Sequence, residues 1–215
     1  MPKIYTKNGD NGITSSFDGT KISKTNKICC FIGEIDELSS RIGIVYSLIP
    51  EKLKHSHGIK ELNIKTDVKN YPKFGCRSGK EPTSPEKISI TYLNILNTIT
   101  NIQRTLQQIN SIISKNSKIE EDITKQYVTD IENNIDFMSG QLPPLTKFIL
   151  PGVSHCDAHV HICRTQTRKV ERLLIEIKPD IYIGENIFKY MNRLSDFFFI
   201  LARWICYKEN LSDRF

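Results

Sequence analysis

The sequence predicts an all-α protein, a bundle of five helices, and three features carry this prediction. Apolar residues recur at alternating steps of three and four in five long segments, which is the spacing of one buried helix face. No segment shows the sustained alternation of apolar and polar residues that a half-buried strand requires. The 215 residues, 39% of them hydrophobic, are enough for a real core. We therefore expect a single domain spanning residues 1–215.

The first helical segment covers residues 28–49, and Pro50 is expected to end it because proline cannot donate the next backbone hydrogen bond. The others cover residues 88–114, 120–138, 154–177 and 185–208. Apolar stripes of this kind favour long helices packed nearly parallel or antiparallel. Two strand-like runs, residues 148–150 and 181–183, are too short to build a sheet.

Residues 51–87 differ from the rest of the chain. They contain Pro72, Pro82 and Pro85, several glycines and lysines, and little periodicity. We interpret them as an inserted, mobile loop between the first two helices. Loops tolerate insertion, so we expect no function from it.

The N-terminal segment, residues 3–25, is rich in turn-forming residues such as Asn8, Gly9, Gly12 and Gly19. One interpretation is a hairpin or a flexible arm. The other is a loop that cradles phosphate, because glycine lets backbone amides approach an anion closely.

Composition narrows the range of partners. A net charge of +6 suits a small anionic ligand, and no dense Lys/Arg run with interleaved aromatics indicates nucleic-acid binding.

The six cysteines are scattered, as expected of reduced thiols. The longest apolar stretch, residues 197–205, contains Arg203 and is too short to span a membrane. The start MPKIYTKNGD resembles no signal or transit peptide, so we expect a cytoplasmic location, or a mitochondrial one if a targeting segment precedes it.

Charged residues form a row on the fourth predicted helix. Arg164, Arg168 and Glu171 are spaced by four and three, so they share one face, and Lys169 and Arg172 flank them. On a surface helix such a row is usually a solvated face.

The fifth predicted helix is apolar around most of its circumference, which is typical of a buried helix. Asn192, Asp196 and Arg203 nevertheless line up along it. A buried charge needs a partner, so these residues either pair with the fourth helix or bind a ligand. With a glycine-rich loop and arginines that fork onto phosphate, the residues themselves indicate an anion or nucleotide site in a helical bundle.

Other sites are less well supported. His155, His159 and His161 lie near Cys156, and a one-turn histidine spacing suits zinc. However, there is no Glu-x-x-His pair and no second ligand cluster, so we expect no metal site and interpret these histidines as surface or capping residues. No nucleophile elbow, Walker loop or dinucleotide fingerprint is present.

Six blocks resemble the ATP:cob(I)alamin adenosyltransferases of the propanediol-utilisation type, in the same order along the chain. They are IYTKNGDNGITSSFDG, IGEIDELSSRIG, NIQRTLQQI, LPPLTKFILPG, HICRTQTRKVERL and NRLSDFFFILAR. The resemblance implies a trimeric five-helix bundle with an N-terminal nucleotide-binding loop and ATP bound between subunits. It also implies transfer of the 5′-deoxyadenosyl group of ATP to the cobalt of cob(I)alamin, with Mg²⁺ assisting. A cobalamin reductase and an adenosylcobalamin-dependent acceptor enzyme are the implied protein partners.

The resemblance also assigns residues. The implied ATP-binding residues are Thr6, Lys7, Asn8, Gly9, Thr14, Ser15, Lys24, Arg168, Lys169, Glu171, Arg172 and Asn192. The implied catalytic residues are Arg168, Glu171, Asp196, and Arg164 with Asp36, the last two as a salt bridge across the subunit interface. Phe148 resembles the aromatic residue that closes the lower face of the corrin.

Three positions depart from the family pattern. Asn8 stands where threonine is usual, Lys169 where arginine is common, and Val153 where the family has a second glycine after proline. Lys169 and Val153 leave open a binding protein that carries adenosylcobalamin with little turnover. A ligand-free interaction module is the third hypothesis, and the charges on the fifth helix argue against it.

Overall fold

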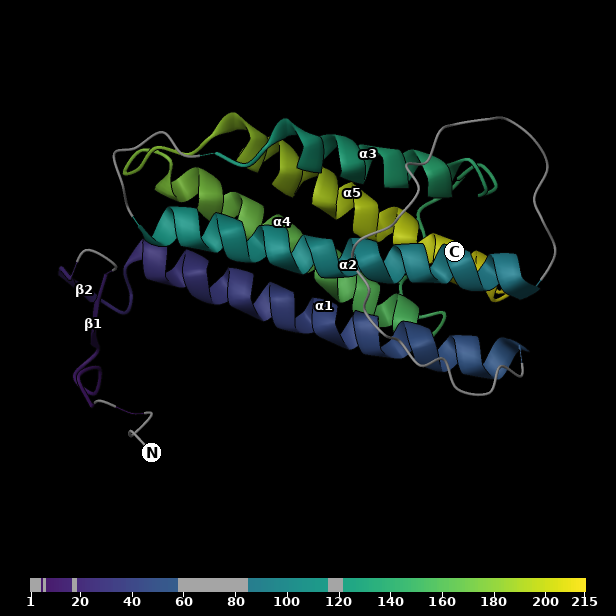
Figure 1. Cartoon of the computed structure of the whole chain (residues 1–215), viewed down its shortest axis with the longest axis horizontal. Coiled ribbons are helices and arrows are strands. Elements are labelled where there is room, and N and C mark those ends of the chain that lie inside the picture. The colour runs from purple at the N-terminus through teal and green to yellow at the C-terminus, as the bar shows by residue number, and fades with distance from the viewer. Residues whose placement is uncertain (1–4, 6, 17–18, 58–84, 116–121) are drawn as a thin grey trace.

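A computed structural model describes residues 5, 7–16, 19–57, 85–115 and 122–215 of the chain. Five long helices form the body of the molecule, as the sequence predicts (Figure 1). They are α1 (Lys27–His57), α2 (Pro85–Ser114), α3 (Lys125–Ser139), α4 (His155–Ile177) and α5 (Glu185–Lys208). The all-α fold class is therefore confirmed, and a small hairpin precedes α1.

The helices pack in the spatial order α2, α1, α4, α5, α3. Helix α4 lies against both α1 and α5, while α2 packs on α1 and α3 packs on α5. Successive helices run in opposite directions along the long axis of the bundle (Figure 1). Polar residues on α4 are therefore close to two neighbouring helices.

The predicted apolar stripes are the buried faces of the helices. On α1, the residues that are at most 1% exposed are Phe31, Ile35, Leu38, Ile42, Val45 and Ile49. On α5, Phe197, Phe198, Leu201 and Trp204 are fully buried. Burial of each such side chain contributes about 1.5–3 kcal/mol, so the stripes hold the bundle together.

Two predicted boundaries of the insertion are wrong. Helix α1 does not end at Pro50 but continues to His57, and α2 already begins at Pro85. Proline lacks only one backbone donor, and the rest of the helical ladder continues around it. Residues 51–57 and 85–87 therefore belong to helices, and residues 58–84 lie outside the described part of the chain.

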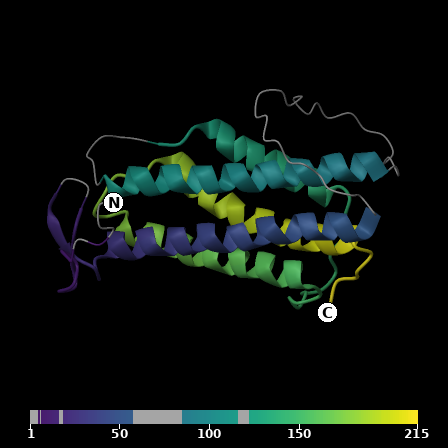
Figure 2. The same cartoon turned by 60° about the horizontal axis from the view of Figure 1, so that its bottom comes forward.

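The N-terminal segment contains the hairpin that was one of the two interpretations. Strands β1 (Ile13–Ser15) and β2 (Lys21–Ser23) pair antiparallel, with Thr14 opposite Ile22. Gly19 has a φ of 84°, a conformation that glycine adopts without steric cost, in the turn between the strands. Figures 1 and 2 show the hairpin beyond the end of the bundle at which α1 begins, whereas the C-terminus lies toward the other end.

Neither strand-like run, 148–150 nor 181–183, forms a strand. Within the described helices, no stretch is both long and apolar enough to cross a lipid bilayer.

Candidate functional site

Helix α4 carries the predicted row of charged residues. The hydroxyl of Ser154 caps the helix by accepting a hydrogen bond from the Asp157 amide (3.2 Å), and Asp157 in the first turn complements the helix dipole. The helix then continues unbroken to Ile177. Arg164, Arg168 and Glu171 therefore lie along one face of it.

Two arginine side chains on α4 have no partner in the part of the chain that the structure describes. Among the described residues, neither Arg168 nor Arg172 takes part in an ion pair or a hydrogen bond. Burial, and then the neighbouring charge of Arg168, hold the pKa of Arg164 below its ordinary value. Arg164 is partly buried, while Arg168 and Arg172 are exposed. Neighbouring positive charges that repel one another favour a bound anion.

A hydrogen-bonded network links α4 to α5 and α3. Glu171 Oε1 accepts from Asn192 Nδ2 (3.0 Å), and Asn192 Oδ1 accepts from Arg193 Nη1 (3.1 Å). Arg193 also pairs with Asp196 (3.2 Å) and with Glu132 of α3 (3.2 Å). The structure thus joins three predicted site residues through an arginine that sequence reasoning missed.

A shallow cavity of about 360 Å³ lies beside Arg193, between α3 and α5. Its lining residues are Glu132, Ile135, Asp136, Arg193 and Asp196. In the sequence, Arg193 could have been noticed only because it lies between Asn192 and Asp196. It does not fall on the same helix face as these two, so the periodicity gave no reason to select it.

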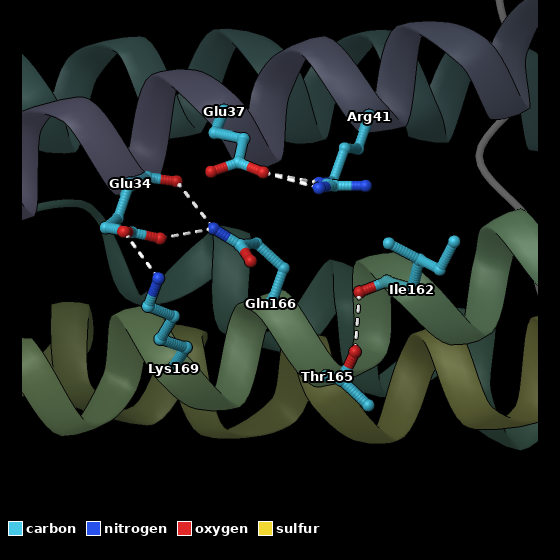
Figure 3. Close-up of polar contacts among 7 residues, drawn as sticks. All are labelled: Glu34, Glu37, Arg41, Ile162, Thr165, Gln166 and Lys169. Carbon is cyan, nitrogen blue, oxygen red and sulfur yellow. Dashed lines mark hydrogen bonds and ion pairs between the residues drawn. The ribbon is translucent and has the colours of Figure 1, made fainter.

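Lys169 points from α4 toward Glu34 of α1 (Figure 3). Its ammonium contacts Glu34 Oε1 at 2.5 Å, and Gln166 Nε2 contacts Glu34 Oε2 at 2.5 Å. The hydrogen bond from Lys169 lowers the pKa of Glu34, although burial opposes this shift. Lys169 is therefore paired with a carboxylate within its own chain.

Asp36 and Arg164 do not pair within one chain. Asp36 is exposed on α1 and has no ion pair among the described residues. The one hydrogen bond of the Arg164 side chain within the described part runs from its Nε to His161 Nδ1, at 3.2 Å.

The N-terminal loop brings Gly9 and Lys24 together. A Cβ atom added to Gly9 would lie 3.0 Å from Lys24 Nζ, so the ammonium lies against the backbone of the loop. Lys7 has a φ of 63°, a left-handed conformation that costs a non-glycine residue of the order of 1 kcal/mol. Asn8 is exposed in the same turn, Thr14 and Ser15 lie in β1, and Thr6 falls outside the described residues.

Phe148 lies in the segment between α3 and α4, and its side chain is 99% exposed. The backbone around it is nevertheless fixed. The Leu150 amide donates to the Arg214 carbonyl (2.7 Å), and the amides of Gly152 and Val153 both donate to Asp157 Oδ2 (2.8 Å each). An aromatic ring held in solvent by a fixed loop is suited to contact a flat apolar ligand.

The sequence profile of the cobalamin adenosyltransferase family matches residues 4–70 and 82–205. The chain belongs to this family.

Relatives of this cobalamin adenosyltransferase homologue match it along nearly its whole length. The human corrinoid adenosyltransferase MMAB is 31% identical over 100% of this chain and 73% of its own length. The corrinoid adenosyltransferase of Bacillus subtilis is 28% identical over 98% of this chain and 90% of its own. A solved structure of a PduO-type ATP:corrinoid adenosyltransferase variant from Lactobacillus reuteri, complexed with cobalamin and ATP, is similar with a TM-score of 0.75. It is 27% identical, and the match covers 99% of this chain and 95% of that one.

For Arg203, the expectation that it pairs with the fourth helix or binds a ligand was wrong. Arg203 is buried, but it pairs neither with α4 nor with an open ligand site. Its guanidinium binds Asp213 of the C-terminal segment (2.8 Å) and the Pro143 carbonyl (3.0 Å). The C-terminal residues have no helical pattern, so nothing in the sequence indicated that they return to α5.

The interpretation of the histidines as surface or capping residues is also wrong for His161, which is only 5% exposed. His161 faces the same row as Arg164 and Arg168 and bonds to Asp157. His155 is exposed, as expected. Among the described residues, no group of three His, Cys, Asp or Glu side chains lies close enough to hold a metal ion.

Proposed function

We propose that this chain transfers the 5′-deoxyadenosyl group of ATP to the cobalt of cob(I)alamin and releases triphosphate. One observation carries the assignment of the site to α4: Arg168 and Arg172 have no partner within the described chain, and Arg164 beside them is partly desolvated. Exposed arginines without a carboxylate partner, next to a partly buried one, are suited to a polyanion such as triphosphate.

The reaction needs few chemical groups from the protein. Cobalt(I) attacks the 5′ carbon of ATP, a Co–C bond forms, and the C5′–O bond breaks with its electron pair leaving on the triphosphate. No proton needs to move, so no general base is required. The task of Arg168, with Lys24, is to stabilise negative charge that develops on the leaving group. Glu171, Asn192 and Asp196 position the nucleoside and its phosphates through the network centred on Arg193.

The remaining nucleotide contacts come from the N-terminal loop: Thr6, Lys7, Asn8, Gly9, Thr14, Ser15 and Lys24. This loop lies beyond one end of the bundle (Figures 1 and 2). Such a loop serves the α4 site of a neighbouring subunit in a homotrimer, with Asp36 and Arg164 paired across the interface.

Mg²⁺ enters the site as part of the nucleotide substrate. It usually keeps several waters and binds substrate phosphates with one or two carboxylates. Glu171 is the carboxylate nearest in sequence to Arg168.

Phe148 serves the second substrate. Its exposed ring covers the lower face of the corrin, where it keeps water and the nucleotide tail of cobalamin away from the cobalt. A four-coordinate cobalt(II) results, which is easier to reduce to the attacking cobalt(I). The cofactor supplies the reactivity, and the protein supplies the environment.

The test is a turnover assay with the protein, ATP, Mg²⁺ and cobalamin under strong reductant, followed by exposure to light. A photolabile adenosylated product is expected. Arg168→Ala should lower kcat by about 10²–10³-fold without altering assembly, because it removes charge stabilisation but no described contact. Lys125→Ala, which removes an exposed charge at the start of α3, is the matched control and should retain full activity.

Normal turnover by Arg168→Ala would remove that residue from the mechanism. Wild-type protein that binds ATP but forms no product would instead favour a carrier of adenosylcobalamin. The pairing of Lys169 with Glu34 is the feature that favours this second function, and Lys169→Arg is then the first reversion to make.

A further inference from the structure

The segment that carries Phe148 is tied to α4 by a buried carboxylate. Asp157 is only 3% exposed, and its Oδ2 accepts hydrogen bonds from two consecutive backbone amides, those of Gly152 and Val153. Gly152 has a φ of 98°, which a side-chain-bearing residue adopts only with strain. The carboxylate therefore fixes the backbone four residues after Phe148 in a specific conformation.

His161 extends this contact along α4. Its Nε2 lies 3.2 Å from Asp157 Oδ1, and its Nδ1 accepts a hydrogen bond from Arg164 Nε at 3.2 Å. Since Nδ1 acts as an acceptor, the ring proton resides on Nε2 and points at Asp157. The ring is buried against the edge of Phe199, with ring centroids 6.3 Å apart, so it cannot turn freely.

We infer that Asp157 and His161 are positioning residues that set the Phe148 loop and the Arg164 side chain through one hydrogen-bonded chain. At one end of this hydrogen-bonded chain, Asp157 holds the backbone of the loop that presents the Phe148 ring to the corrin. At the other end, His161 orients Arg164 in the nucleotide-facing row of α4. The inference rests on the proposed function, because it assigns Asp157 and His161 to those two substrate contacts. Burying a carboxylate and an imidazole costs free energy unless both are hydrogen-bonded. Here each of the two side chains is hydrogen-bonded on two sides, so the pair forms a continuous connection between the loop and Arg164.

Two conservative substitutions of His161 separate the two links. His161→Asn places an amide oxygen near the position of Nδ1, so it retains an acceptor for Arg164 but does not reach Asp157. His161→Gln places an amide nitrogen near the position of Nε2, so it retains a donor for Asp157 but loses the acceptor for Arg164. The same two substitutions at His155, an exposed position on the same helix, are the matched controls.

The experiment measures amide hydrogen exchange of residues 149, 150, 152 and 153 in the ligand-free protein, then the KM values for ATP and cobalamin. It also measures, by electron paramagnetic resonance, the four-coordinate fraction of bound cob(II)alamin in the presence of ATP. His161→Asn should speed exchange at Gly152 and Val153 by about tenfold, because Asp157 loses the hydrogen bond that fixes its orientation toward these two amides. It should also raise KM for cobalamin and lower the four-coordinate fraction. His161→Gln should leave loop exchange unchanged and raise KM for ATP.

Unchanged loop exchange in His161→Asn would overturn the inference, as would identical effects of the two variants on all readouts. If His161→Asn does not fold, Asp157→Ser removes the same hydrogen bond by changing its other partner. It should also speed exchange at the amides of Gly152 and Val153. Hydrogen exchange needs no turnover. A wild-type protein without adenosyltransferase activity would therefore sink the proposed function, while the exchange data would still decide whether the chain positions the loop.

Discussion

Arg203 and Asp213 form a forked ion pair that fastens the C-terminal segment to α5. Arg203 Nη2 lies 2.8 Å and Nε 3.1 Å from Asp213 Oδ2, and the same Nη2 donates to the Pro143 carbonyl at 3.0 Å. The Leu150 amide adds a contact to the Arg214 carbonyl. The loop that carries Phe148 is thus held by the C-terminal segment on one side and by Asp157 on the other.

Arg203→Leu should destabilise the protein by about 3–5 kcal/mol, because it leaves a partly buried carboxylate and a carbonyl without their donor. The free energy of unfolding in urea measures this loss, and hydrogen exchange at Leu150 should rise with it. Arg214→Ala removes an exposed side chain from the same segment but keeps the carbonyl contact, so it should be nearly neutral. Equal stability of the two variants would show that the C-terminal segment is not fastened by Arg203.

Asp36→Arg should dissociate the proposed trimer, since it would oppose Arg164 of the neighbouring subunit with a like charge. Sedimentation velocity measures the assembly state. The double variant Asp36→Arg with Arg164→Asp restores opposite charges and should recover part of the assembly. The milder Asp36→Asn should weaken assembly or ATP binding. A trimer that survives Asp36→Arg intact, with normal ATP affinity, contradicts the proposed interface.

Acid should destabilise the protein through Asp157. Burial alone raises the pKa of this carboxyl, but hydrogen bonds from His161, Gly152 and Val153 outweigh it and hold the pKa below 3.8, its ordinary value. The stabilisation is therefore complete above pH 3.8 and is lost as the pH falls through the lower folded-state value. Asp157→Asn places an NH₂ group against the Nε2–H of His161 and should cost about 3 kcal/mol near neutral pH.

Thermal unfolding of the two proteins at several pH values measures this effect. The difference in melting temperature should be greatest near neutral pH and should shrink as Asp157 of the wild type becomes protonated. A constant difference down to the most acidic pH would mean that the Asp157 carboxylate contributes nothing through its charge.

The helices were predictable because burial imposes a period on the sequence. Positions such as Ile35 and Leu38 recur at helical spacing, and the same residues are buried in the structure. The end of α1 was not predictable in this way. Pro50 is a local signal for termination, and the loss of one backbone bond did not outweigh the continuing helix.

The site was only partly predictable, since a side chain's partner depends on tertiary structure. Arg168 could be placed in the charged row of α4 from spacing alone, but the pairing of Lys169 with Glu34 of α1 could not. His161 carried no sequence signal for burial, because its partner Asp157 lies one helical turn away in a segment that reads as polar. Arg203 was correctly predicted to need a partner, yet that partner comes from a segment without periodicity.

Arg193 offers a test of the network that joins α4, α5 and α3. Its contacts with Glu132 and Asp196 are between half-exposed groups, so their loss should change stability by less than about 1 kcal/mol. Its bond to Asn192 Oδ1, however, fixes the amide so that Nδ2 faces Glu171. Arg193→Lys cannot bond all three partners in fork geometry and should raise KM for ATP several-fold while the melting temperature changes little. Lys189→Ala is the matched control, because it breaks an exposed ion pair with Glu185 on the same helix but leaves Asn192 untouched. If both variants keep the wild-type KM for ATP, the orientation of Asn192 is set by Glu171 alone, and Arg193 has no part in the nucleotide site.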